Sequence, residues 1–155
     1  MAPPTFIYSV KFICGIQDPP LSSNPNKCLT VQPGYYSTEI NIHNFHPGPS
    51  TGHPATINKQ LLLLIDNGVE KGKETNKVQP QPFAQNFQLF PGEATFDDCC
   101  NLLKPVLPPN KPLLSIGFLV LQSDMALNVT AVYTASDPKS GSISIDVETI
   151  NERQV

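Results

Sequence analysis

Proline restricts this chain more than any other feature of its sequence. Seventeen of the 155 residues are proline, and they recur from Pro3 to Pro138. Proline inside a helix removes a backbone hydrogen bond and clashes with the preceding turn, and inside a sheet it is confined to edges and strand starts. The chain is therefore expected to fold as short strands joined by many loops, with almost no helix.

Seven segments alternate apolar and polar side chains in the way that strands do. They span residues 5–16, 35–43, 55–68, 83–90, 113–123, 126–136 and 142–150. In the first segment, Tyr8, Val10 and Phe12 are expected to share the buried face. In the second, Ile40 and Ile42 are expected to face the core, with polar side chains opposite.

Three segments carry further information about the sheet. The run Leu61–Ile65 is apolar on both faces, which indicates either a central strand of a monomer or a strand at an interface. The last segment places Ile143, Ile145 and Val147 on one side, which we expect to face inward, as in a strand near a sheet edge with one solvated face. The tight link around Asp124 predicts that the fifth and sixth segments pair as a hairpin.

One stretch has helical character. In "TFDDCCNLLKPVL", residues 95–107, Asp97 or Asp98 could cap the helix start and Pro105 would end it. Together these features predict an all-β fold. We expect one antiparallel β-sandwich domain of immunoglobulin-like type over residues 1–155, with about seven strands, one short helix and extended terminal arms. The tryptophan that marks antibody domains is absent, since the chain has none.

The charges are few and scattered. The net formal charge is -3, and no cluster of Lys and Arg could hold a nucleic acid backbone. No segment approaches the roughly 18 consecutive apolar residues of a membrane-spanning helix, and the N-terminus lacks the features of a secretory signal. The sequence therefore predicts a soluble, cytoplasmic protein, with leaderless export or a processed precursor left open.

The chain has four cysteines, Cys14, Cys28, Cys99 and Cys100. Cys14 and Cys28 flank a loop rich in proline and asparagine, which a disulfide could close in an oxidising compartment. Adjacent cysteines such as Cys99 and Cys100 rarely bond to each other, because the geometry is strained. Three pairings are possible and the sequence does not choose among them. Ordinary buried thiols are the first interpretation.

All three histidines lie close together, at His43, His46 and His53. Imidazoles at this spacing can reach one zinc or copper ion, and Glu39 lies on the same strand face as His43. Zinc sites usually show paired ligands on both sides of a turn, and only one pair is present here. Solvated turn histidines are the simpler interpretation, without a cofactor, and a metal site is the alternative.

Other side chains have simpler structural interpretations. Cys99 and Cys100 lie near a helix start, where a thiolate would be activated, but no motif of nucleophilic catalysis accompanies them. Asn128–Thr130 matches a glycosylation acceptor, yet it lies within a predicted strand and is interpreted as a chance match. Tyr35 and Tyr36 could offer stacking surfaces to a small ligand or a carbohydrate, although paired aromatics beside a turn more often fill cores and corners.

Five blocks of sequence together resemble a set of small, uncharacterised bacterial β-sandwich proteins that carry such blocks in the same order. The blocks are "PGYYSTEINIHN", "FDDC", "GFLVLQS", "ALNVTAVYTA" and "SISIDVETI", and the resemblance extends from about Lys11 to Ile150. They are strand blocks rather than a catalytic signature, so the resemblance implies a fold and no activity. The strand order is also similar to that of the sensory rhodopsin transducer family, oligomeric β-sandwiches with interaction roles, which implies self-association.

The residues and the resemblance together predict a non-enzymatic structural or interaction protein, a subunit of a homo-oligomeric or polymeric assembly. Low surface charge favours close packing of identical subunits. An exposed edge at residues 142–150 could pair with a strand of a second copy or of another protein. A metal-binding protein or metal-dependent enzyme that uses His43, His46 and His53 is the alternative function.

Overall fold

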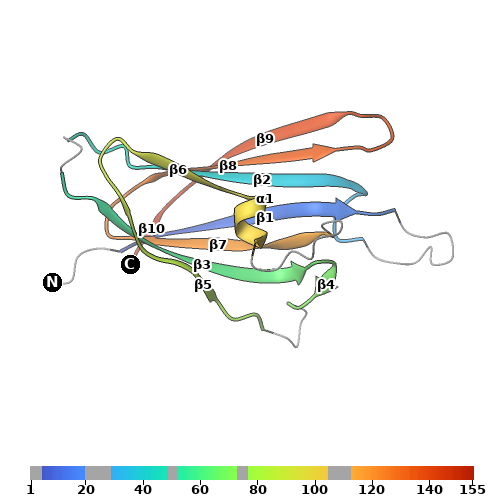
Figure 1. The fold of residues 1–155 in the computed structure, drawn as a ribbon, viewed down its shortest axis with the longest axis horizontal. Coiled ribbons are helices and arrows are strands. Elements are labelled where there is room, and N and C mark those ends of the chain that lie inside the picture. Colours follow the sequence, from blue (N-terminus) through green and yellow to red (C-terminus); the bar gives the residue numbers. More distant parts are fainter. Residues whose placement is uncertain (1–4, 20–28, 49–51, 73–76, 105–112) are drawn as a thin grey trace.

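The computed structural model describes residues 5–19, 29–48, 52–72, 77–104 and 113–155. These residues form ten strands and one short helix (Figure 1). In chain order the elements are β1 (Phe6–Gln17), β2 (Gly34–His43), β3 (Ala55–Asp66), β4 (Val69–Glu70), β5 (Gln81–Leu89), β6 (Ala94–Asp98), α1 (Cys99–Leu103), β7 (Ser115–Ser123), β8 (Asn128–Ser136), β9 (Ile143–Ile150) and β10 (Arg153–Gln154).

The predicted all-β class with one short helix is confirmed, and all pairings between these strands are antiparallel. The expected number of about seven strands is too low for the described residues. Seven of the ten strands match the predicted segments, and β4, β6 and β10 are short additions. These three escape prediction because two to five residues are too few to show an alternation.

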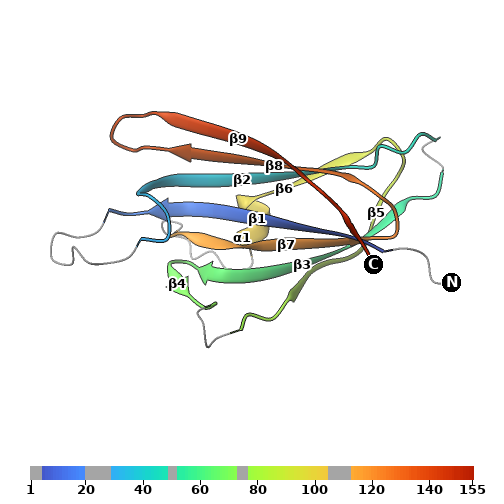
Figure 2. The ribbon, with the colours of Figure 1, turned by 180° about the vertical axis from the view of Figure 1, so that it is seen from behind.

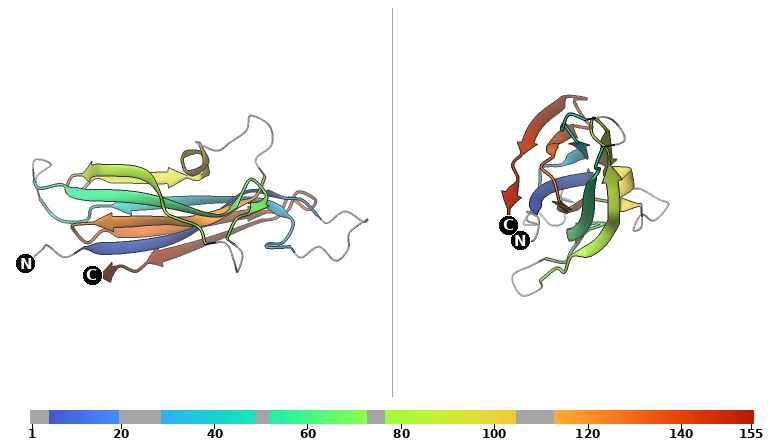
Figure 3. Two further views of the ribbon diagram at one scale, coloured as in Figure 1. Left: turned by 90° about the horizontal axis from the view of Figure 1, so that it is seen from below. Right: turned by 90° about the vertical axis from the view of Figure 1, so that its left-hand side faces the viewer.

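Hydrogen bonds join the strands into one sheet with the order β4-β3-β7-β1-β2-β8-β9, to which β5, β6 and β10 attach through β3, β2 and β1. The sheet has two halves. The β1 half contains β10, β1, β7, β3, β5 and β4, and the β2 half contains β6, β2, β8 and β9. The halves meet where Gly15–Gln17 of β1 pair with Gly34–Tyr36 of β2. Viewed end on, the sheet is strongly curved (Figure 3).

The inward side chains of both halves belong to one core cluster. Its largest fully buried members are Tyr8, Val10, Phe12, Ile40, Ile42, Ile57, Leu102, Leu119, Leu121 and Val129. The predicted buried faces of β1 and β2 are therefore confirmed. Gly117 of β7 allows close packing in the core, because a Cβ added there would meet the Leu62 carbonyl oxygen at 2.1 Å and the Phe12 ring at 2.8 Å.

The run Leu61–Ile65 lies in β3, which pairs with β7 on one edge and with β5 and β4 on the other. It is thus an internal strand of the sheet, as one of the two interpretations predicts. Leu61, Leu63 and Ile65 are buried, whereas the two leucines between them are only half-buried. The two faces are therefore covered unequally.

The predicted hairpin between the fifth and sixth segments is wrong. β7 pairs with β1 and β3, and β8 pairs with β2 and β9, so the link between β7 and β8 crosses from one half of the sheet to the other. Polar contacts hold this crossing. The Tyr8 hydroxyl donates to the Leu127 carbonyl at 3.1 Å and accepts from the Leu127 N–H at 2.6 Å, and Asp124 accepts from the Thr56 N–H at 2.8 Å.

The predicted helix is present, and it begins at the later of the two predicted capping positions. Residues 94–98 form β6, which pairs with β2, and α1 covers only Cys99–Leu103. Asp98 is the N-cap and accepts from the Asn101 N–H at 2.8 Å, so one of the two predicted capping residues is confirmed. The predicted stop at Pro105 lies outside the described residues. Leu102 and Leu103 are buried and attach the helix to the core.

The orientation predicted for the last strand is also wrong. Ile143, Ile145 and Val147 of β9 are 67%, 66% and 61% exposed. The register explains this, because the inward residues Val129 and Ala131 of β8 lie opposite Ile150 and Glu148 of β9, so the residues between them point outward. The predicted position at a sheet edge is confirmed, since β9 ends the strand order of the described residues.

Candidate functional site

The open edge of β9 is the first candidate site. β9 pairs with β8 over eight consecutive residues without a register shift, and no strand of the described residues pairs with its other edge. The strand lies at the margin of the molecule in both face-on views (Figure 2). An unpaired edge presents free N–H and C=O groups and is a template for a further strand.

The apolar side chains of Ile143, Ile145 and Val147 form a ridge beside this edge, here called the β9 ridge. All three lie on the face of the sheet that points away from the core. Val132 of β8 lies opposite Val147 on the same face and is half-buried. Natural edge strands usually carry charged side chains, proline or bulges that discourage pairing. β9 has no proline and no bulge, and its two charged residues, Asp146 and Glu148, lie on the face opposite the ridge.

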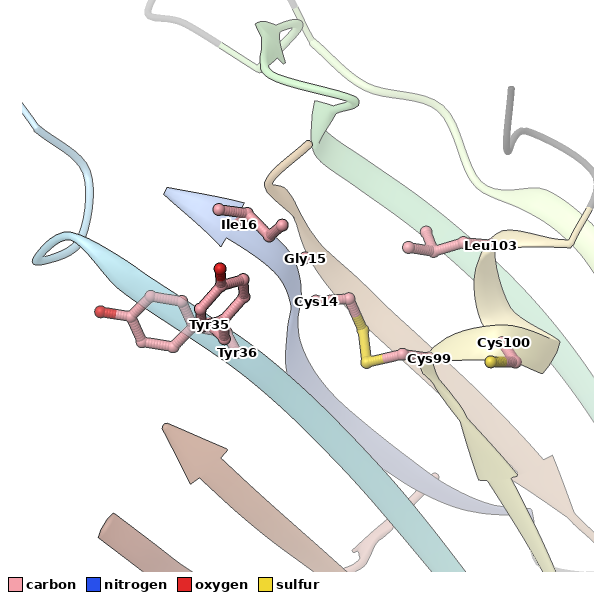
Figure 4. Close-up of a pocket in the computed structure, with 8 residues that line it drawn as sticks. All are labelled: Cys14, Gly15, Ile16, Tyr35, Tyr36, Cys99, Cys100 and Leu103. Carbon is pink, nitrogen blue, oxygen red and sulfur yellow. A yellow bond between two sulfur atoms is a disulfide. The ribbon is translucent and has the colours of Figure 1, made fainter. Parts of the chain in front are cut away.

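A shallow apolar pocket of about 240 Å³ is the second candidate site (Figure 4). It lies where the two halves of the sheet meet, beside the start of α1. Its lining consists of Cys14, Gly15, Ile16, Tyr35, Tyr36, Cys99, Cys100 and Leu103. Tyr35 is 47% exposed and offers its ring to solvent, whereas the Tyr36 hydroxyl donates to the Gln32 carbonyl at 2.5 Å. Burial raises the pKa of Tyr36. The two adjacent tyrosines thus differ, one exposed and one anchored.

A disulfide between Cys14 and Cys99 forms part of the pocket wall and joins β1 to α1 (Figure 4). The prediction of buried thiols is therefore wrong for these two residues, and the possible Cys14–Cys28 pairing is excluded because Cys14 is already bonded. Cys28 itself lies outside the described residues. Cys100 is a free, exposed thiol. Sequence spacing could not reveal this bond, because its two cysteines are 85 residues apart and meet only through the fold.

The three histidines are placed near each other in sequence but have different surroundings. His43 ends β2 and is exposed. His46 stacks on Phe45 with ring centroids 4.5 Å apart, and its Nε2 lies 2.8 Å from the Ala126 carbonyl oxygen. His53 is exposed, and its Nδ1 lies 3.4 Å from the Pro54 carbonyl oxygen. Within the residues that the structure describes, no three His, Cys, Asp or Glu side chains form a group able to hold a metal ion. The zinc or copper site stays a prediction.

A buried ion pair, which the sequence interpretation did not include, links the two halves of the sheet. The Lys59 Nζ of β3 lies 2.7 Å from the Asp97 Oδ2 of β6, and both side chains are almost fully buried. The Lys59 ammonium also lies 4.9 Å from the centre of the Phe87 ring of β5. A signal was present, because Lys59 alternates with Ile57 and Leu61 on the core face of a strand. Asp97 is therefore an ion-pair partner rather than a helix cap.

A groove of about 440 Å³ separates the outward face of β1 from the inward face of the β8–β9 hairpin. Tyr133 lies in this groove and donates from its hydroxyl to the Glu148 Oε2 at 3.1 Å. Burial, helped by the hydrogen bond and the negative charge of Glu148, raises the pKa of Tyr133 to about 12. This contact fixes the inward face of β9 against β8 and leaves the β9 ridge pointing outward.

Comparison with known proteins finds no matching family model, no matching curated protein and no matching solved structure. The resemblance to small bacterial β-sandwich proteins and to the sensory rhodopsin transducer family therefore stays a prediction. The described part of the chain contains no helix long and apolar enough to cross a membrane.

Proposed function

We propose that this protein is a non-enzymatic structural subunit that assembles with itself by strand addition at the open edge of β9. One observation carries the proposal: β9 is a regular strand whose outer edge pairs with no other described strand, and three of its branched apolar side chains are each more than 60% exposed. Burial of apolar surface is worth about 25 cal/mol per Å². Covering the β9 ridge while pairing its backbone would combine this gain with the hydrogen bonds of a β ladder.

The layered form of the fold is part of the same proposal. Both halves of the sheet contribute to one core, which supports an immunoglobulin-like β-sandwich whose second layer, the β2 half, ends at β9. In such a sandwich the mean strand directions of the two layers cross at about 30°. An experimental structure with a crossing near a right angle would contradict this type.

The compartment in which such an assembly works is a further expectation. The chain was expected to be cytoplasmic, but disulfides persist mainly in oxidising compartments. The Cys14–Cys99 bond favours export over the cytoplasm. Counting free thiols in protein isolated from its native source under thiol-blocking conditions tests this choice.

Two matched valines test the assembly. Val147 of the β9 ridge is 61% exposed, and Val69 of β4 is 62% exposed at a distant part of the sheet. We expect light scattering at micromolar concentration to give an oligomer for the natural protein and for Val69→Lys, and a monomer for Val147→Lys, because a charge on the ridge opposes pairing. A monomeric natural protein would contradict the proposal.

A second candidate function is the binding of a small aromatic ligand in the disulfide pocket. It is favoured by the exposed Tyr35 ring, which stands beside an apolar cavity wall. Aromatic pairs contribute about 0.5–1.5 kcal/mol beyond area burial. NMR titration with indole measures this binding. The affinity for indole should fall in Tyr35→Ala and stay unchanged in Phe45→Ala, a control whose aromatic ring is similarly exposed at 50%.

A further inference from the structure

We propose that β9 pairs antiparallel with β9 of a second copy, about a two-fold axis that runs midway between the two copies of Ile145. This inference rests on the proposed function and names both the partner and the register of the pairing. It follows from three observations: the direction of the backbone groups at the open edge of β9, the irregularity of the other long margin strand, β5, and the position of the carboxylates in β9.

The free backbone groups belong to the same residues as the β9 ridge. At the base of the β8–β9 hairpin, the Asp137 N–H donates to the Ser142 carbonyl at 3.0 Å. Hydrogen-bonded pairs alternate along an antiparallel ladder, so Ser144 and Asp146 also bond to β8. Ile143, Ile145 and Val147 consequently direct their N–H and C=O groups to the open edge. The Val147 N–H donates to the Asp146 carboxylate at 3.0 Å, so it would have to exchange this acceptor for a carbonyl of the second copy.

The other long margin strand, β5, is a poor partner for β9. It contains Pro82, and its pairing with β3 shifts register twice, on both sides of Lys59. Asn86 within β5 has a positive φ of 52°, which departs from the extended conformation of a strand. β9 is regular throughout, so its best partner in an identical subunit is β9 itself. Such a contact uses the same edge in both copies and closes the assembly as a two-fold dimer.

The carboxylates select the register. A two-fold axis perpendicular to the sheet keeps the ridges of both copies on one face, so one residue of β9 must lie opposite its own copy, and the axis is named here by that residue. With the axis at Ile145, Ile143 lies opposite Val147 of the second copy, and Ser144 lies opposite Asp146 of the second copy. With the axis at Asp146, two carboxylates lie opposite each other, which is destabilising. With the axis at Ser144, Val147 loses its apolar partner because its counterpart lies before the start of β9.

Cysteine substitutions at three neighbouring positions test this register. We use Ser144→Cys, Ile145→Cys and Asp146→Cys, each in a background with Cys28→Ser and Cys100→Ser. Opposite residues of a hydrogen-bonded pair have Cα atoms about 5.5 Å apart, within the range of about 4.4–6.8 Å that a disulfide spans. A residue next to the axis is separated from its own copy by more than about 7 Å and cannot be bridged. Mild oxidation should therefore cross-link Ile145→Cys at least about 10-fold more than either neighbour.

The possible outcomes separate this inference from the proposed function. A dominant cross-link at residue 144 or 146 would overturn the Ile145 axis while leaving assembly at β9 intact. A dimer by light scattering without any cross-link would overturn the β9–β9 contact. A monomer would overturn the proposed function as well.

A charge substitution provides a second readout that needs no oxidation. In the proposed register, Ser144→Lys places an ammonium opposite Asp146 of the second copy, so the dimer dissociation constant should fall by about 3-fold. Ser37→Lys, on an exposed position of β2 away from the open edge, is the control and should leave it unchanged. A weaker dimer in Ser144→Lys would contradict the register.

Discussion

Among the residues that the structure describes, the sheet has two long margin strands, β5 and β9, and they lie at opposite sides of the molecule (Figure 1). β5 is interrupted by Pro82, by Asn86 with a positive φ and by two register shifts against β3. β9 keeps eight consecutive pairs with β8 and exposes branched apolar side chains. The protein thus protects one margin by irregularity and leaves the other regular.

The irregularity of β5 coincides with a buried charge in the core. Its two register shifts flank Lys59 of β3, whose ammonium lies near the Phe87 ring and pairs with Asp97 of β6. β9 contacts no such buried charge, and its inward face is held by the contact between Tyr133 and Glu148. An irregular edge is a poor template for a further strand, whereas a regular one favours pairing. The regularity of β9 and the irregularity of β5 therefore support the proposal that the protein assembles at β9.

The largest expected effect comes from breaking the buried Lys59–Asp97 ion pair, which lies beside β5. Asp97→Ala leaves the Lys59 charge buried without its partner, which should cost about 3–5 kcal/mol of unfolding free energy. Urea denaturation measures this loss. The double variant Lys59→Met, Asp97→Leu removes both charges and should cost much less. An equal loss in the single and the double variants would mean that packing, rather than the unpaired charge, determines the effect.

An intermediate effect should follow from introducing into β9 a proline like Pro82 of β5. Asp146→Pro removes an N–H that we assign to the β8 ladder and should cost about 1–3 kcal/mol. Ile145→Pro removes an N–H that faces the open edge, where proline is tolerated, and should cost less than about 1 kcal/mol. Thermal or urea unfolding compares the two. Ile145→Pro should also dissociate the assembly, and a reversed order of stability would overturn the hydrogen-bond assignment along β9.

The smallest effect concerns the groove beneath β9. The pKa of Tyr133 is raised from 10.0 to about 12, so the folded state holds this proton more tightly than the unfolded state. Its contribution to stability is complete below pH 10 and is lost as the pH rises towards about 12. Tyr133→Phe should reduce the slope of stability against pH in this interval. Burial also raises the pKa values of Tyr8 and Tyr36. These two residues should therefore leave part of the pH dependence of stability in the Tyr133→Phe variant. An unchanged slope would contradict the assignment to Tyr133.

Alternation of side chains predicts which residues share a face but not which face is covered. For β1 and β2 the apolar face is buried, as expected, because both strands lie over the shared core. For β9 the same rule fails. The curved sheet places its apolar face outside, and the inward face is filled instead by Ile150, Glu148 and Asp146. An apolar ridge on an edge strand therefore looks identical in sequence to a buried one.

Long-range contacts were the other part that the sequence could not supply. The crossing between β7 and β8 is as short as a hairpin link, and only the hydrogen bonds of Tyr8 and Asp124 show that it joins two halves of the sheet. The Lys59–Asp97 pair left a visible signal, a charge on an apolar face. The Cys14–Cys99 bond left none, because it depends on where β1 and α1 meet.

The Cys14–Cys99 disulfide encloses β2 to β6 in one covalent ring of chain, since its two ends are 85 residues apart. A single proteolytic nick inside that ring opens the loop without releasing a fragment. The cut strands stay tethered to β1 and α1 and can keep their places in the sheet. Release of a fragment from this ring would require a second cut within it or reduction of the disulfide.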